Sequence, residues 1–152
     1  MRTVDDLLGQ KGRDVYVVAP DASVHDAVRI MCERNVGAVV VCSNRELVGI
    51  ISERDCVRRV MLPGRSPHET KVSQAMTHPV RSVGVHDSVD HCMQMMTDKR
   101  VRHLPVMDGT RVVGMISVGD VVKAQLTEQE EVISGLESYI HGPSASVRPP
   151  AS

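Results

Sequence analysis

The feature that most constrains this chain is an internal repeat. A shift of 65 residues superposes residues 15–60 on residues 80–125 without a gap. In the clearest match, Val-Gly-Ile-Ile-Ser at 48–52 with Asp55 falls on Val-Gly-Met-Ile-Ser at 113–117 with Asp120. This periodicity predicts a duplicated supersecondary unit. Because a unit of about 45–50 residues cannot bury a sheet face alone, we expect the two copies to pack on each other with pseudo-twofold symmetry.

Both copies show the same order of local signals: strand, helix, hairpin, helix. Ser23 and Ser88 are N-cap candidates for amphipathic helices, and a last helix is expected near Ser52 or Ser117. The expected ranges are a strand at 15–18, a helix at 24–34 and a hairpin from 38–42 and 47–51 in the first copy, and 80–83, 89–99, 103–107 and 112–116 in the second. The predicted fold class is α/β (α+β), with β-α-β-β-α occurring twice.

Changes in composition along the chain suggest its division. We expect a first repeat with an N-terminal helix over 1–62, a linker rich in Pro, Gly and Ser over 63–71, and a second repeat over 72–126. Apolar residues at helical spacing predict a C-terminal helix over 127–141, with Thr127 as its candidate cap. Residues 142–152 contain three prolines and three serines and are expected to form a disordered tail.

Composition narrows the possible partners. The chain has 27 Val, only two Tyr and no Phe or Trp, which predicts an aliphatic core with Val-rich strands. The lack of aromatic side chains argues against a stacking platform for single-stranded nucleic acid. A formal net charge of −1 carries no overall polyanion-binding signature, although it allows a local basic patch.

The sequence also suggests a compartment. No apolar run approaches the roughly 20 residues of a membrane span, and Asp5 and Asp6 lie where a signal peptide would be apolar. The cysteines form no Cys-x-x-Cys pair, and all four are expected to be reduced thiols in buried segments: Cys32, Cys42, Cys56 and Cys92. We therefore expect a cytoplasmic protein without membrane partners.

The repeated Ser-x-x-Asp segment carries the functional argument. Ser52 or Ser117 at the start of a helix would present free backbone N–H groups to a phosphate. Asp55 or Asp120 could then accept hydrogen bonds from the two hydroxyls of a ribose. An ordinary helix capping box has the same pattern and is the structural alternative. The recurrence in both copies favours a ligand, because packing the copies together brings both segments towards one cleft.

Basic residues accompany these segments and would suit a phosphate or pyrophosphate. Arg54 lies inside the first Ser-x-x-Asp segment, and Arg100, Arg102 and His103 precede the second hairpin. A charged, solvated surface explains Arg100 equally well.

Three other functions are alternatives to nucleotide binding. The seven histidines show no metal-ligand spacing, and no nucleophile with its base is evident, so neither a metal site nor catalysis is expected. Arg54, Arg58 and Arg59 could contact nucleic acid, but the cluster is short. A structural dimerisation protein without a ligand is the third alternative. The methionines at 93, 95 and 96 could belong to the core or to an interface.

The sequence resembles a tandem pair of cystathionine-β-synthase (CBS) domains, a Bateman module, over about residues 3–123. The resemblance rests on Gly-Ile-Ile-Ser-Glu-Arg-Asp at 49–55, Gly-Met-Ile-Ser-Val-Gly-Asp at 114–120, Val-Arg-His-Leu-Pro-Val at 101–106, Pro-Asp-Ala-Ser-Val at 20–24 and Val-Ser-Gln-Ala-Met-Thr at 72–77. It implies a stand-alone, bacterial-type signalling module that binds AMP, ADP, ATP, NAD(H) or S-adenosylmethionine and assembles as a homodimer.

The resemblance also implies site residues, which fall into three groups. Ser52 with Asp55 and Ser117 with Asp120 match the two ribose-phosphate positions, while Arg102 and His103 match the phosphate-facing pair. The adenine-framing positions are matched by Val17, Val18, Gly37, Ala38, Val39, Ser82, Val83, Leu104 and Pro105.

The two halves differ at these positions. Gly37-Ala38 stands where the second copy has Arg102-His103, Gly119 replaces Arg54, and Val17 stands where the family often has Thr. The two sites are therefore expected to differ in affinity or in preferred adenosine ligand. The expected function is a regulatory module that signals to an effector protein by conformational change. The alternatives are a structural homodimerisation module or a nucleic-acid-binding protein of the same family.

Overall fold

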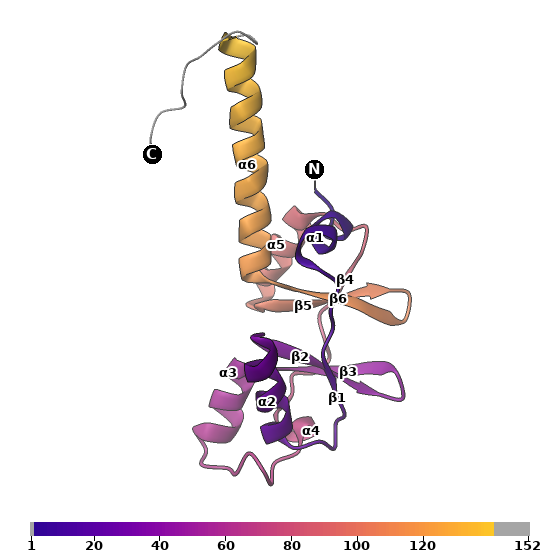
Figure 1. Cartoon of the computed structure of the whole chain (residues 1–152). Coiled ribbons are helices and arrows are strands. Elements are labelled where there is room, and N and C mark those ends of the chain that lie inside the picture. Colours follow the sequence, from indigo (N-terminus) through magenta and orange to yellow (C-terminus); the bar gives the residue numbers. More distant parts are fainter. Residues whose placement is uncertain (1, 142–152) are drawn as a thin grey trace.

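The two copies of the repeat form two three-stranded sheets with flanking helices, one half above the other (Figure 1). The structure is a computed structural model and describes residues 2–141. The first half contains β1 (Val17–Val18), α2 (Val24–Arg34), β2 (Ala38–Ser43), β3 (Glu46–Ser52) and α3 (Glu53–Cys56), which continues as the π-helical segment η1 (Val57–Met61). The second half contains β4 (Val83–Gly84), α5 (Val89–Lys99), β5 (His103–Asp108), β6 (Arg111–Ser117) and α6 (Val118–His141).

The sheet topology is the same in both halves. The first strand pairs in parallel with the second, and the second and third strands form an antiparallel hairpin. The register shifts between Val41 and Cys42 in one hairpin and between Val106 and Met107 in the other, again 65 residues apart. The mixed α+β class and the duplicated β-α-β-β-α order are confirmed.

Local sequence accounts for the long helices of each half. The Ser23 and Ser88 side chains accept hydrogen bonds from the backbone N–H of Asp26 and His91, and so cap α2 and α5. Both helices cover their expected ranges. The first strands are shorter than expected, two residues instead of four, because only Val17–Val18 and Val83–Gly84 find partners in the neighbouring strand.

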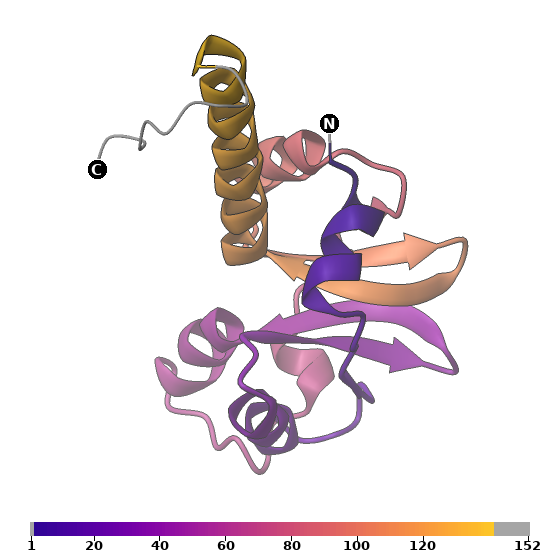
Figure 2. The same ribbon diagram turned by 45° about the horizontal axis from the view of Figure 1, so that its top comes forward.

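Each repeat begins with a short helix that packs against the other half, so the two helices are exchanged. The N-terminal helix α1 (Val4–Lys11) packs Val4, Leu7 and Leu8 into the core of the second half. Conversely, α4 (Val72–Ala75), which precedes the second half in sequence, packs Val72 and Ala75 into the core of the first. The second half is therefore completed by a helix that precedes the first half in sequence, and the first half by a helix that follows the linker. Figure 2 shows the N-terminal segment passing from one half to the other.

The helix α6 is continuous from Val118 to His141 and extends beyond the second half (Figure 1). The expected break at Thr127 is absent from it, because the Thr127 hydroxyl donates a hydrogen bond to the Lys123 carbonyl oxygen within the same helix. The expected tail at 142–152 lies outside the described residues. No helix within residues 2–141 is long and apolar enough to cross a membrane.

The cysteines are less uniform than expected. All four are free, and Cys56 and Cys92 are buried, where burial raises the pKa of each thiol to about 11. Cys42 is half-buried, whereas Cys32 is exposed. The expectation of a buried thiol was wrong for Cys32, because it lies on the solvent side of α2, while Val24, Ala27 and Met31 form the buried side.

Candidate functional site

Among the described residues, two clefts between the halves are related by the pseudo-twofold repeat. The first has a volume of about 780 Å³ and is lined by Gly37, Ile50, Ser52, Glu53, Arg54, Asp55, Arg58, Arg59, Thr77, Arg100, Val101, Arg102 and His103. The second has a volume of about 380 Å³ and is lined by Lys11, Asp14, Tyr16, Asn35, Val36, Gly37, Ala38, His103, Met115, Ser117 and Asp120. Each cleft combines the Ser-x-x-Asp segment of one repeat with the start of the hairpin of the other.

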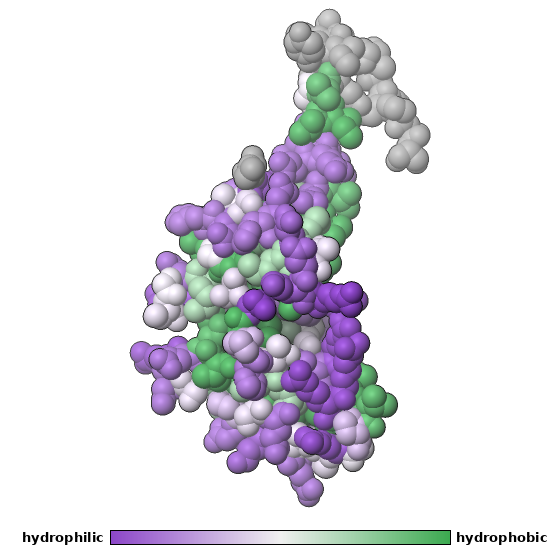
Figure 3. Space-filling model, turned by 180° about the vertical axis from the view of Figure 1, so that it is seen from behind, coloured by the Kyte–Doolittle hydropathy of each residue, from purple (hydrophilic) through white to green (hydrophobic). Residues whose placement is uncertain are grey.

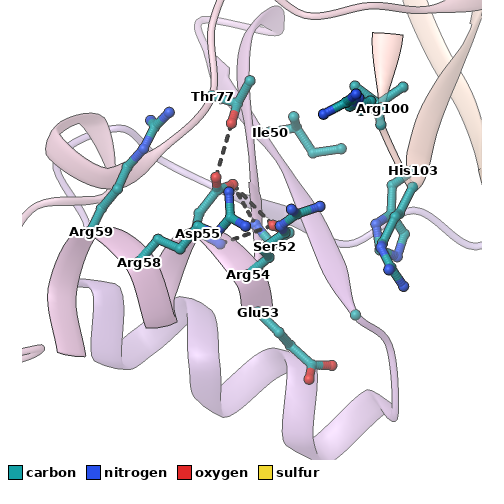
Figure 4. Close-up of a pocket in the computed structure, with 13 residues that line it drawn as sticks. Ile50, Ser52, Glu53, Arg54, Asp55, Arg58, Arg59, Thr77, Arg100 and His103 are labelled. Carbon is teal, nitrogen blue, oxygen red and sulfur yellow. Dashed lines mark hydrogen bonds between the residues drawn. The ribbon is translucent and has the colours of Figure 1, made fainter. Parts of the chain in front are cut away.

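The first Ser-x-x-Asp segment forms the floor of the first cleft (Figure 4). The Ser52 hydroxyl accepts a hydrogen bond from the Asp55 backbone N–H at 3.1 Å, and Asp55 Oδ2 accepts one from the Ser52 N–H at 3.0 Å. The capping box is therefore present. The other carboxylate oxygen, Oδ1, accepts a hydrogen bond from the Thr77 hydroxyl at 3.0 Å. This network fixes the half-buried Asp55 carboxylate at the cleft surface.

Backbone hydrogen bonds hold each Ser-x-x-Asp segment beside a hairpin. The Glu53 N–H donates to the Gly37 carbonyl oxygen at 3.0 Å, and the equivalent Val118 N–H donates to Arg102 at 2.9 Å. Because the two bonds are related by the same 65-residue shift, both Ser-x-x-Asp segments have the same backbone arrangement relative to their hairpins.

In the second cleft, a lysine from α1 pairs with Asp120, the aspartate equivalent to Asp55. Lys11 Nζ donates hydrogen bonds to Asp120 Oδ2 at 2.7 Å and to the Met115 carbonyl oxygen at 2.6 Å. Burial acts to raise the pKa of Asp120, but the hydrogen bonds from Lys11 and Ser117 outweigh it, so this pKa lies below the usual value. Asp120 is therefore ionised and paired within the chain.

His103 lies between the two clefts and lines both. Burial lowers its pKa, because the imidazolium is poorly solvated there, and the carboxylates of Asp120 and Glu53 only partly oppose this effect. The ring also closely approaches Gly37, where an added Cβ would lie 3.1 Å from His103 Nε2. The neutral imidazole thus closes the space between the clefts.

The first cleft carries five arginines, at positions 54, 58, 59, 100 and 102. Figure 4 labels the first four of them. Within the part of the chain that the structure describes, none of the five forms an ion pair with a carboxylate. Arg59 donates hydrogen bonds to the carbonyl oxygens of Ala75 and Met76. The remaining four make no side-chain hydrogen bond among the described residues, so their guanidinium groups are available to an anion.

The structure brings together some of the expected site residues and leaves others outside the clefts. Gly37, Ser52, Arg54, Asp55, Arg102 and His103 line the first cleft, and Gly37, Ala38, His103, Ser117 and Asp120 line the second. The rest of the adenine-framing set lines neither: Val17 is exposed, Ser82 is half-buried, and Val18, Val39, Val83, Leu104 and Pro105 are buried.

Some lining residues carried no functional assignment in the sequence. Thr77 lies in a segment that matched the family, but its contact with Asp55 joins residues 22 positions apart. Lys11 reaches Asp120 across 109 positions, and no local pattern indicates such a pair. Among the side chains of residues 2–136, no group of three or more His, Cys, Asp or Glu residues could hold a metal ion.

The duplicated fold and the paired clefts define a tandem-repeat module of the Bateman type. Residues 4–62 and 72–127 each match the CBS domain family, so the chain belongs to the CBS-domain proteins.

Individual CBS-domain proteins are similar over most of the chain. The mitochondrial CBS domain-containing protein CBSX3 of Arabidopsis thaliana is 40% identical over 149 residues, which cover 92% of this chain and 72% of the relative. YhcV of Bacillus subtilis is 30% identical, covering 84% of this chain and 89% of its own. The solved structure of a putative signal-transduction protein from Burkholderia ambifaria is 42% identical, with a TM-score of 0.81, and covers 84% of this chain and 96% of that one.

Proposed function

We propose that this protein is a regulatory module that binds an adenosine-containing ligand between its two repeats. AMP, ADP, ATP, NAD(H) and S-adenosylmethionine are the candidates. The observation that carries the proposal is the placement of Asp55 and Asp120, each fixed by a capping box or its equivalent at the surface of an inter-repeat cleft. A carboxylate in such a position can accept hydrogen bonds from both hydroxyls of a ribose.

The proposed ligand pose uses both halves of the chain. In the first cleft, Asp55 binds the ribose, the arginines face the phosphates, and the adenine lies against backbone and aliphatic groups near Gly37 and Val101. Gly37 and Ala38 have the corresponding place in the second cleft, and in both the adenine lacks a Phe or Trp to stack on. Val17, Val18, Val39, Ser82, Val83, Leu104 and Pro105 would act by shaping the strands beneath the adenine rather than by lining the clefts. A CBS domain pair solved in complex with 5′-methylthioadenosine and S-adenosyl-L-methionine, 22% identical with a TM-score of 0.74, supports this ligand class.

The proposed output is a change in the relative orientation of the repeats. A ligand that contacts Asp55 from one half and Arg102 from the other would link the halves directly. We propose that a homodimer transmits this change to an effector protein and that the module is regulatory rather than catalytic. A structural neighbour described as a hexameric CBS-CP12 protein, 25% identical, supports self-association. We place the protein in the cytoplasm, a reducing compartment that suits its free cysteines.

Isothermal titration of the full chain with AMP, ATP, NAD and S-adenosylmethionine tests the proposal. We expect at least one to bind, and Asp55→Ala with Asp120→Ala to abolish binding. Asp108→Ala is the matched control, because Asp108 lies at the hairpin tip of β5 and lines neither cleft. Thermal unfolding of each variant separates lost binding from lost folding.

Two results would overturn this function. Binding that survives the double substitution would contradict the role of the aspartates, and failure of all four compounds to bind would favour the structural homodimerisation alternative. Salt-dependent binding to RNA or DNA that ignores both aspartates would favour the nucleic-acid alternative.

A further inference from the structure

The two clefts share a backbone frame but carry opposite charge. The first is lined by five arginines and two carboxylates, Glu53 and Asp55, which leaves a formal charge of +3 with His103 neutral. The second is lined by Lys11 against Asp14 and Asp120, which leaves −1. Since the repeat relates the two clefts, this contrast comes from side chains and not from the fold.

Both parts of each cleft contribute to the contrast. At the start of the hairpins, Arg100 and Arg102 line the first cleft, where their repeat equivalents in the second are Asn35 and Gly37. In the following helices, Arg54 and Arg59 are replaced by Gly119 and by Ala124, which is buried. The arginines of the first cleft therefore come from both repeats and converge from opposite walls.

The arginines are also unpaired with carboxylates, and four of them, all except Arg59, make no side-chain hydrogen bond among the described residues. Unlike Lys11, which is paired with Asp120 at 2.7 Å, none of the five has an ion-pair partner among residues 2–136. Like charges so gathered repel one another, and a polyanion relieves that repulsion. Guanidinium groups match phosphate oxygens with two parallel hydrogen bonds each, so several guanidiniums suit a chain of phosphates better than a single one.

We propose that the first cleft selects ligands with two or more linked phosphates, such as adenosine di- and triphosphate, whereas the second selects adenosine derivatives that carry little or no negative charge. This inference rests on the proposed function for its adenosine part and deepens it by assigning a ligand class to each cleft. The arginines supply the countercharge, so the phosphate chain is bound without a divalent cation. A triphosphate in the first cleft contacts both walls and thereby ties the two repeats together.

Titrations in EDTA with ATP, AMP, 5′-methylthioadenosine and inorganic tripolyphosphate test this assignment. For the intact chain, we expect ATP and tripolyphosphate to bind more tightly than AMP. In Arg100→Asn/Arg102→Gln, we expect the affinity for ATP and tripolyphosphate to fall about tenfold or more, because charged hydrogen bonds are lost. The affinity for 5′-methylthioadenosine, which has no phosphate, should change by less than about twofold. Arg111→Gln, at the far end of β6, is the matched control.

A variant that adds an arginine to the second cleft separates an effect on binding from an effect on folding. Asn35 and Arg100 have the same left-handed backbone conformation, with φ of 54° and 55°, so Asn35→Arg places an arginine where the fold already tolerates one. We expect Asn35→Arg to add affinity for ATP at the second cleft and to retain the thermal stability of the intact chain.

The outcomes separate the two proposals. If AMP and ATP bind equally, or if ATP affinity ignores Arg100 and Arg102, the charge assignment is overturned while the adenosine function stands. If tripolyphosphate binds through the arginines but no adenosine compound binds, the phosphate-chain site stands and the adenosine function is overturned. If ATP requires a divalent cation, the role given to the arginines is wrong.

Discussion

Gly114 and Gly49 allow the exchanged segments to lie directly against the hairpins. A Cβ added at Gly114 would lie 2.7 Å from a methyl group of Leu8, which is fully buried and has no space to move. We expect Gly114→Ala to lower the free energy of unfolding by about 1–3 kcal/mol, measured by urea denaturation. Gly9→Ala is the control, because nothing lies within 4 Å of its added Cβ and Ala favours the helix α1. Equal stabilities of the two variants would contradict this packing.

His103 makes stability depend on pH. Burial holds its pKa below the ordinary value of 6.5, so the unfolded chain binds this proton more readily than the folded chain. Its contribution is therefore complete above about pH 6.5 and is lost as the pH falls through the lowered pKa of the folded state. Asp120 and Glu53 face the ring and favour its protonation, whereas Lys11 and Arg102 oppose it.

Unfolding midpoints in urea at pH 7.5 and pH 5.5 test this dependence. We expect His103→Gln to lose less stability than the intact chain over this interval, because the titrating group is gone. His86→Gln is the control, since His86 is exposed and lines neither cleft. The same loss of stability in both variants would show that other groups cause the pH dependence.

At the scale of elements, α6 has an apolar face that the described residues leave open. Leu126, Ile133 and Leu136 are exposed to 55%, 55% and 56%, and the space-filling view shows apolar side chains along this helix (Figure 3). With Val122 they lie at intervals of four, seven and three residues, which fit the heptad pattern typical of helix pairs. An apolar face of this length favours association with a second copy, as the homodimer proposal requires.

Sedimentation equilibrium of the intact chain and of Leu126→Glu/Ile133→Glu tests this face. We expect the intact chain to sediment as a dimer, and the double variant to shift towards the monomer with unchanged helical circular dichroism, because charges cannot be buried without partners. Glu130→Gln is the matched control on the same helix, because Glu130 is exposed and polar. An unchanged mass of the double variant would place the dimer contact elsewhere.

Some helices and strands could be predicted from local sequence signals and others could not. The Ser caps and helical periodicity predicted α2 and α5 over their full ranges, because caps and spacing act within one or two turns. The lengths predicted for β1 and β4 were too great, because a strand extends only as far as its hydrogen bonds to the neighbouring strand. The continuity of α6 through Thr127 was likewise missed, because a threonine hydroxyl can bond within a helix as well as cap one.

At the scale of the whole molecule, the exchange of α1 and α4 joins the two halves. Reciprocal backbone hydrogen bonds connect Val24 with Thr70 and Val89 with Arg2, each at the start of a long helix. The core of the second half therefore depends on residues that precede the whole first half in sequence, and the core of the first half depends on residues that follow the linker. We infer that the halves unfold together rather than independently.

Hydrogen exchange of two core variants tests this arrangement. Leu8→Ala should cost about 2–5 kcal/mol and reduce amide protection first in β4–β6, although Leu8 precedes β1 in sequence. Val72→Ala should reduce protection first in β1–β3, with a smaller loss because a smaller side chain is removed. A first loss of protection in β1–β3 for Leu8→Ala, or in β4–β6 for Val72→Ala, would contradict the exchange.

The sequence by itself determined the duplicated unit, the order of its elements and the two Ser-x-x-Asp corners. These features depend on identity between the copies and on hydrogen bonds that span three or four residues, as between Ser52 and Asp55. Only the tertiary structure decided that each cleft is lined by residues of both repeats and that Lys11 pairs with Asp120. It also decided that five arginines line the cleft of Asp55 and none lines the cleft of Asp120. The physical reason is that these contacts join residues tens of positions apart. A local sequence pattern does not indicate which distant segments will pack together.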